Sequence, residues 1–246
     1  AHGMVRPSFV PPPPIRALRE LTRYRKTQVT ARGQEIQRLE KLLQDAGIKL
    51  SSVASRVWSK SARAMVEALI EGDATPEALA ELAKGPMRAK IPALVEALEN
   101  CWDSHHSAVA RRILAHIDFL DESIGALSDE ISERLRPVEA AVTLLCTIPG
   151  VSTLTAEVIV AETGADMARF PSAAQLAAWA GVAPANHESA GKRRPAGTRQ
   201  GGRWLRNALI EAAKAAARTN NTYLAAKYRK VAGIPPKCGG IPYEEW

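Results

Sequence analysis

The chain has 246 residues, enough for a substantial hydrophobic core. Hydrophobic residues make up 46% and charged residues 24%, a composition that excludes an intrinsically disordered chain. Its apolar runs are broken by charges before the roughly 20 residues of a membrane span, and its three cysteines are too scattered for a zinc site. We therefore expect a cytoplasmic protein with no membrane partner.

Positive charge is concentrated in two parts of the chain. Residues 1–50 carry 10 Lys or Arg against four Asp or Glu, and residues 182–230 carry 11 against two. The segment between them is acidic. A solvated helix face usually mixes both signs, so the imbalance in residues 182–230 favours a surface that binds a polyanion.

Residues 1–14 are predicted to be a proline-rich linker, because Pro11 to Pro14 favour the polyproline conformation over a helix. From Ile15 to Leu42, apolar residues then recur mostly at three- and seven-residue steps, which predicts one long amphipathic helix that ends before Gly47. Such a helix pairs with another, in the same chain as a hairpin or between subunits as a coiled coil.

A mainly α-helical, coiled-coil region is predicted for residues 15–137. Thr75 and Pro76 have the pattern of an N-cap and first helical residue. Residues 106–136 form a second long periodic stretch, an antiparallel partner for the first. Three carboxylates in this stretch could form a cluster, namely Asp118, Asp121 and Glu122. Because they lie beside apolar positions at helical spacing, we expect them instead on a solvated face of the helix.

Residues 138–230 are predicted to be a separate helical domain, and residues 231–246 an atypical tail. The run from Leu144 to Gly164 has the pattern of a helix-hairpin-helix, in which amides at the second helix's N-terminus hold a phosphate. The alternative is a turn with a purely structural role. The amides in question belong to Gly150, Val151, Ser152 and Thr153.

Two further helices are predicted in this domain. One begins after Ser172 and ends at Gly181, with Trp179 in the core. The other, rich in alanine, runs from about Arg203 to Arg218 and is the last one expected. Gly201 and Gly202 before it would leave its N-terminus open to an anion.

The segment between these helices carries one serine, Ser189, in a flexible and basic setting. If residues 187–189 are extended, His187 and Ser189 point to the same side, so His187 could act as a base or orient the hydroxyl. The alternative is that residues 189–191 form only a turn. Basic side chains could neutralise charge developing on a phosphodiester or hold the nucleic-acid backbone. These are Lys192, Arg193, Arg194, Arg199, Arg203 and Arg206.

Several short motifs, in a specific order and spacing, are similar to the insertion-sequence 110/116/902 family of transposases, and the resemblance covers most of residues 5–230. The motifs include Thr147-Ile148-Pro149-Gly150-Val151, Arg169-Phe170-Pro171-Ser172, Leu176-Ala177-Ala178-Trp179-Ala180-Gly181, Glu188-Ser189-Ala190-Gly191-Lys192-Arg193 and Arg203-Trp204-Leu205-Arg206.

The resemblance implies a recombinase with a RuvC-like domain bearing four acidic ligands for Mg²⁺, a coiled-coil segment and a serine-bearing transposase domain. Some members are directed to DNA by a structured guide RNA. Ser189 matches the serine thought to join the cleaved strand. We expect the metal site to lie upstream of Met4, so that this chain alone would not complete the reaction. The tail also departs from the family, as expected after truncation or a frameshift.

Three interpretations follow from the sequence. The first is a transposase fragment in which Ser189 attacks a DNA strand. The second is a non-catalytic nucleic-acid-binding protein that uses the hairpin and the basic segment. The third is a remnant that only forms homo-oligomers through residues 15–46.

Overall fold

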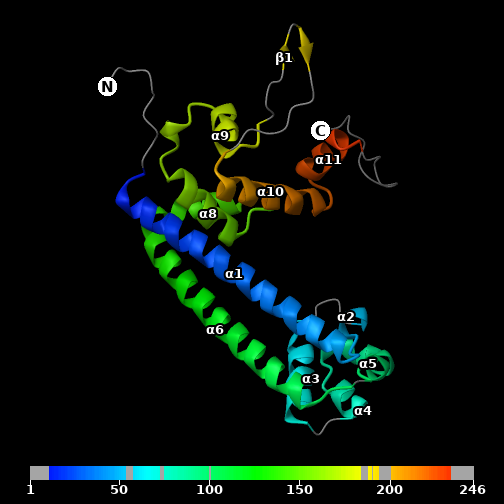
Figure 1. The fold of residues 1–246 in the computed structure, drawn as a ribbon. Helices are drawn as coiled ribbons and strands as arrows, with labels where there is room; N and C mark the ends of the chain where they lie inside the picture. Colours follow the sequence, from blue (N-terminus) through cyan, green and yellow to red (C-terminus); the bar gives the residue numbers. More distant parts are fainter. Residues whose placement is uncertain are drawn as a thin grey trace. The chain divides into compact units, whose positions relative to one another are not determined.

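The computed structural model describes residues 11–53, 58–72, 75–99, 101–183, 188–189, 191–193 and 201–233, and over these residues the chain is mainly α-helical, as predicted (Figure 1). Contacts divide the chain into two compact units. Unit 2 is Arg25–Ser128, and unit 1 combines Ala1–Tyr24 with Asp129–Trp246. Two long helices contribute to both units: α1 (Pro13–Asp45) and α6 (Ser104–Leu135). No described helix is long and apolar enough to cross a membrane. The division predicted at residues 15, 138 and 231 stays a prediction.

Helix α1 begins earlier than the proline pattern predicts. Pro13 is its first residue, and the amides of Ile15 and Arg16 each donate to the carbonyl of Pro12 at 3.1 Å. The predicted polyproline linker is therefore wrong for Pro13 and Pro14. The reason is that amide hydrogens in the first turn of a helix have no acceptor within the helix, so proline, which lacks this hydrogen, loses no hydrogen bond there.

Unit 2 is a helical cluster with its own core. Between α1 and α6 it contains α2 (Leu50–Val53), α3 (Lys60–Glu71), α4 (Pro76–Glu81), the 3₁₀ helix η1 (Gly85–Lys90) and α5 (Ile91–Ala97). The Thr75 hydroxyl accepts from the Ala78 amide at 3.3 Å, which confirms the predicted N-cap. The fully buried side chains at the centre of this core include Ile48, Met65, Leu79, Leu94 and Leu98.

Within unit 2, polar contacts join α1 to α6. Arg25 donates to Ser128 at 3.4 Å, Arg32 pairs with Asp121, and Glu35 lies 3.4 Å from His116. Residue numbers rise on one helix as they fall on the other, so the two segments run antiparallel. The knobs-into-holes packing of a coiled coil stays a prediction.

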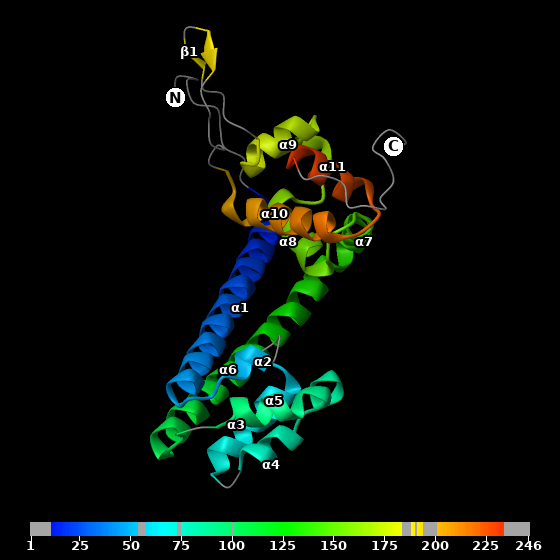
Figure 2. The ribbon, with the colours of Figure 1, turned by 90° about the vertical axis from the view of Figure 1, so that its right-hand side faces the viewer.

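Unit 1 packs its helices around α8 and α10. Helix α8 contacts α7 and α10, and α10 also contacts α9 and α11 (Figure 2). The sequence prediction placed the end of the helical part at Arg218 and missed α11. The elements are η2 (Arg136–Val138), α7 (Glu139–Cys146), α8 (Thr153–Thr163), η3 (Met167–Arg169), α9 (Ala173–Ala180), β1 (Glu188–Ser189), β2 (Lys192–Arg193), α10 (Arg203–Arg218) and α11 (Tyr223–Val231).

The predicted ends of α9 are confirmed, but the predicted role of Trp179 is wrong. Ser172 accepts from the Gln175 amide at 3.3 Å, and Gly181 ends the helix in the left-handed conformation at φ 73°. Trp179 is 37% exposed and packs against Phe170, with ring centroids 5.4 Å apart. A helix of eight residues next to small alanines offers too little apolar surface to enclose an indole.

A buried carboxylate joins the start of α1 to the end of α8. The Glu162 side chain is 3% exposed and accepts from Nε and Nη2 of Arg23 at 2.7 and 2.8 Å. Arg19 donates from Nε to the carbonyl of Ala161 at 2.9 Å, and also reaches the carbonyl of Glu162. These cations meet the negative end of the α8 dipole. Hydrogen bonding to Glu162 raises the pKa of Arg23, whereas burial lowers the pKa of Arg19.

Replacing Glu162 tests this junction. We expect Glu162→Gln to lower the free energy of unfolding by about 3 kcal/mol, because two partly buried guanidinium groups lose their counter-charge. Urea denaturation would measure the change. The matched control is Glu130→Gln, which removes the partner of Arg134 on the surface of α6 and should cost about 0.5 kcal/mol or less. Equal losses in the two variants would contradict the importance of the buried carboxylate.

Candidate nucleic-acid interface and serine loop

The segment that carries Ser189 begins and ends at one place in unit 1. A Cβ placed on Gly201 would lie 2.4 Å from the Gly181 amide nitrogen and 2.6 Å from the carbonyl carbon of Ala180. The Gly202 amide also donates to the carbonyl of Trp179 at 3.4 Å. The backbones at the two ends of the segment are therefore in direct contact, and position 201 has no room for a side chain. We call residues 182–200 the serine loop.

Ser189 lies in a short hairpin within the serine loop. Strand β1 pairs with β2 in antiparallel register, with Glu188 opposite Arg193 and Ser189 opposite Lys192. Gly191 in the turn has φ 71°, a conformation that favours glycine. The extended conformation predicted near Ser189 is confirmed for residues 188–189. His187, Arg194 and Arg199 lie outside the described residues, so their roles beside Ser189 stay predictions.

The serine loop ends at the start of α10, where aromatic and basic side chains meet. Gly202 is the N-cap of α10 and has no side chain to cap the first amides. The guanidinium carbon of Arg203 lies 5.1 Å from the centroid of the Trp204 ring, and that of Arg23 lies 5.9 Å from it. Arg206 is half-buried in the next turn. This end of α10 combines an uncapped helix N-terminus with cation–π pairs, an arrangement suited to an anionic ligand.

The turn between α7 and α8 is used partly for packing. Gly150 has φ 88°, and a Cβ there would lie 2.3 Å from the Ala212 carbonyl oxygen and 2.6 Å from the Ala216 amide nitrogen of α10. The Val151 amide donates to the carbonyl of Ile148 at 3.0 Å, and the Ser152 hydroxyl caps α8 by accepting from the Thr155 amide at 3.3 Å.

Of the four residues predicted to bind phosphate, Gly150 packs against α10 and the Val151 amide already donates to the carbonyl of Ile148. Ser152 and Thr153 remain exposed. Phosphate binding by this hairpin stays a prediction. Gly150 of this hairpin contacts α10 at Ala212, which lies nine residues beyond Arg203, or about 14 Å along the helix axis. One phosphate could not reach both places, but a nucleic-acid strand could.

Sequence reasoning missed the part that α1 plays here. Nothing in the sequence placed Arg23 beside Trp204, which lies far along the chain. The available signal was the spacing of Arg16, Arg19 and Arg23, which puts three cations on one face of α1.

The carboxylates of α6 were predicted to form a solvated face, and Asp118, Asp121 and Glu122 are indeed exposed, with two of them also paired with arginines of unit 2. Both carboxylate oxygens of Asp118 accept from Arg63, at 2.8 Å for Oδ2, and these bonds hold the pKa of Asp118 below its usual range. Asp121 pairs with Arg32. These groups do not fit the acidic metal site that the resemblance implies. In the described parts of the chain, no three His, Cys, Asp or Glu side chains are grouped to hold a metal ion.

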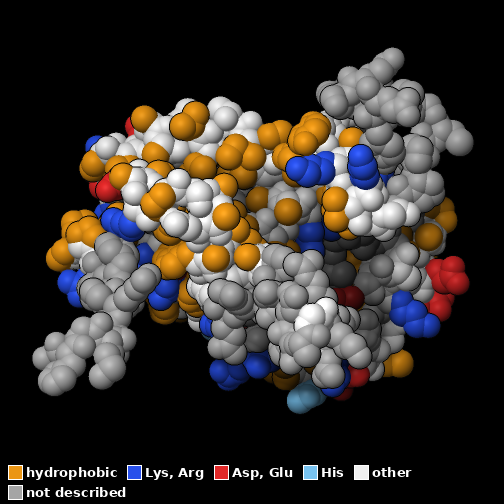
Figure 3. Space-filling view, turned by 90° about the horizontal axis from the view of Figure 1, so that it is seen from above, with side chains coloured by type: hydrophobic (Ala, Val, Ile, Leu, Met, Phe, Trp, Pro, Cys, Tyr) orange, Lys and Arg blue, Asp and Glu red, His pale blue; other side chains and the backbone are white. Residues whose placement is uncertain are grey.

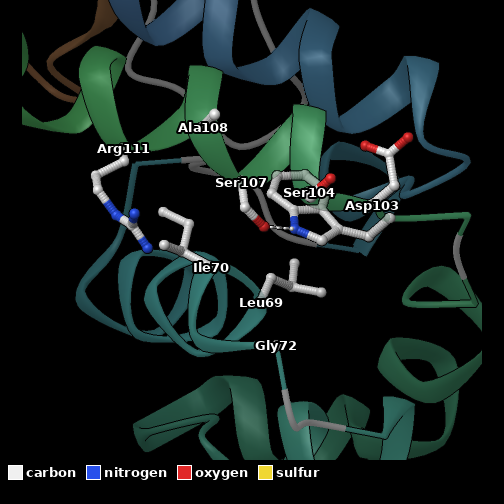
Figure 4. Close-up of a pocket in the computed structure, with 9 residues that line it drawn as sticks. Leu69, Ile70, Gly72, Asp103, Ser104, Ser107, Ala108 and Arg111 are labelled. Atoms are coloured by element: carbon white, nitrogen blue, oxygen red, sulfur yellow. Dashed lines mark hydrogen bonds between the residues drawn. The ribbon is translucent and has the colours of Figure 1, made fainter.

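A cavity of about 510 Å³ with a mixed polar and apolar lining is found in unit 2 between α3 and the start of α6 (Figure 4). Arg111 and Ser107 project from α6, and Leu69 and Ile70 face them from α3. The Trp102 indole donates to the Ser107 hydroxyl at 2.8 Å. Of the predicted site residues that the structure describes, none lines this cavity.

Comparison with known proteins supports the resemblance seen in the sequence. The family model of the transposase IS116/IS110/IS902 family matches residues 142–229, which run from α7 to α11 and include Ser189. No curated protein matches the chain closely enough to count as a relative.

The packing of Gly150 can be tested by Gly150→Ala. We expect a loss of about 3 kcal/mol or more in unfolding free energy, because the new Cβ meets backbone atoms of α10 and the backbone is strained. Thermal or urea unfolding would measure it. The matched control is Gly72→Ala. Gly72 also has a positive φ, 92°, but a Cβ there would have no atom within 4 Å, so this change should cost about 1 kcal/mol. Similar losses in the two variants would show that α10 does not restrict position 150.

Proposed function

We propose that this chain, which carries a transposase domain of the IS116/IS110/IS902 family at residues 142–229, binds DNA at the serine loop and the start of α10 and attacks a DNA strand with Ser189. The observation that carries the proposal is the contact of Gly181 with Gly201. It ties both ends of the serine loop to the body of the domain and to the uncapped N-terminus of α10. Because both ends are fixed, the length of the loop limits how far the nucleophile can move from these anion-binding residues.

In the proposed step, the hydroxyl oxygen of Ser189 forms a bond to phosphorus while the bond from phosphorus to one sugar oxygen breaks. His187 is the proposed base that takes the serine proton, and the leaving sugar oxygen receives a proton in turn. Lys192, opposite Ser189 in the hairpin register, and the neighbouring arginines would stabilise the charge that develops on the phosphoryl oxygens. The Mg²⁺ that the resemblance implies would further neutralise phosphate charge, but no group in the described residues fits it.

A second candidate function is nucleic-acid binding without cleavage. It is favoured by the grouping of Arg23, Arg203 and Trp204, which needs no reaction to bind a phosphate and stack on a base. A structured guide RNA, implied by the resemblance for some members, would be attracted by the same positive charge. Formation of homo-oligomers through the long helices also remains a proposal.

Trapping of a covalent complex separates the two candidates. We expect a fluorescent DNA duplex that carries a nick opposite the cleavage site to yield a protein–DNA adduct that survives denaturing electrophoresis. Ser189→Ala should abolish the adduct without loss of DNA binding, and Ser132→Ala, an exposed serine on α6, should leave it unchanged. An adduct that persists in Ser189→Ala would contradict the role of Ser189. Binding with no adduct in any variant would favour the second candidate.

The salt dependence of DNA binding tests the basic loop. We expect the double variant Arg193→Gln/Arg194→Gln to bind a duplex more weakly, and the slope of log affinity against log salt to fall by about 1.8, because two phosphate contacts are lost. Fluorescence anisotropy over a range of NaCl concentrations would measure it. The control Arg134→Gln/Arg136→Gln removes the same charge from exposed residues paired with Glu130 and Glu133. An equal change in slope for this control would mean that only net charge matters.

A further inference from the structure

Unit 1 contains an apolar cavity of about 690 Å³, and Val151 is the only predicted site residue within the described part of the chain that lines it. Its walls come from α7, α8, α10 and α11, from the turns beside them, and from Met167 of η3 and Leu176 of α9. Hydrophobic side chains are exposed in many places on the face seen from above, with Lys and Arg side chains between them (Figure 3). Five large hydrophobic residues that line the cavity are exposed: Leu144, Ile148, Met167, Tyr228 and Val231.

These exposed hydrophobic side chains are grouped around one cavity rather than scattered over the surface. Leu144 on α7 is 70% exposed, and Val231 on α11 is 81% exposed. Scattered hydrophobic residues on a surface need no explanation, but a group of them around one concave cavity marks a binding site. An occupant would need apolar side chains to cover them.

The lining of the cavity also favours an occupant with negative charge. Among the described residues that line it, Lys227 on α11 is the only charged one, and its ammonium group lies 5.6 Å from the centroid of the Tyr223 ring. An apolar segment that brings a carboxylate would therefore suit this cavity better than a basic one.

A segment with this composition follows α11 directly. Val231, the last residue of α11, lines the cavity, and the chain continues past the described residues as 234–246. That segment contains Ile234, Ile241, Tyr243 and Trp246, and it carries two adjacent carboxylates, Glu244 and Glu245, against one lysine, Lys237. Fully extended, it could span on the order of 40 Å, several times the breadth of such a cavity.

We propose that residues 234–246 bind in the apolar cavity of their own chain. Ile234 follows the wall that Val231 forms, the aromatic residues of the tail cover the hydrophobic lining, and a tail carboxylate meets Lys227. The tail then protects an apolar face of the transposase domain from association with other chains. This inference does not depend on DNA binding or on Ser189.

The native cysteines allow a direct test by cross-linking. Cys146 is exposed at the end of α7, next to lining residue Leu145, and Cys238 lies in the tail. In the full chain with Cys101→Ser, a short bifunctional maleimide should link Cys146 to Cys238 within one molecule, at a yield independent of protein concentration. The added Cys238→Ser change should abolish the link. Absence of an internal link would overturn the proposal, as would linked dimers that increase with concentration, which indicate a second copy.

Dye binding provides an independent measurement. We expect removal of residues 234–246, or the milder change Tyr243→Ser/Trp246→Ser, to raise the fluorescence of added anilinonaphthalene sulfonate several-fold by uncovering the cavity. Circular dichroism would show that the helices remain folded. The matched control is Tyr24→Ser, an exposed tyrosine on α1 away from the cavity lining, which should not change the signal. Unchanged fluorescence in the folded tail variants would contradict docking of the tail.

Discussion

The carboxylate of Glu162 is buried at the end of α8, where Arg23 binds both of its oxygens and Arg19 occupies the adjoining carbonyl groups. A buried charge is tolerated only when its partners are fixed, so this group constrains the first turns of α1 against α8. The constraint extends further, because Arg23 also lies over Trp204 at the start of α10. One ionised side chain thus connects α1, α8 and the helix that follows the serine loop.

The second constraint is steric. Gly181 and Gly201 are in backbone contact, and Gly150 is in backbone contact with α10. Both contacts exclude a Cβ, and both fix the ends of helices that border the proposed interface. The chemistry proposed for Ser189 depends on this arrangement, since a nucleophile on a loop with free ends would rarely meet a bound phosphate in a reactive geometry. The family model covers Gly150, Gly181, Ser189 and Gly201, and the packing shows what Gly150 and Gly201 do.

Local features of the fold could be predicted from the sequence, and long-range contacts could not. The caps at Thr75 and Ser172 depend on side chains three residues from their partners, so the sequence alone identifies them. The contact of Arg23 with Trp204 and the packing of Gly150 on α10 join distant residues, and no periodicity encodes such pairs. Trp179 was assigned to the core by residue type, whereas its exposure depends on what packs on α9. For the candidate site, the sequence predicted the serine and its basic setting but missed the contribution of α1.

The central claim is that DNA meets this protein at the serine loop and the start of α10. Hydrogen–deuterium exchange of the full chain, measured with and without a short DNA duplex, tests it most directly. We expect DNA to slow exchange in peptides covering residues 188–206, with little change in α3, α4 and α5 of unit 2. Protection confined to unit 2, or spread evenly over both units, would contradict the account.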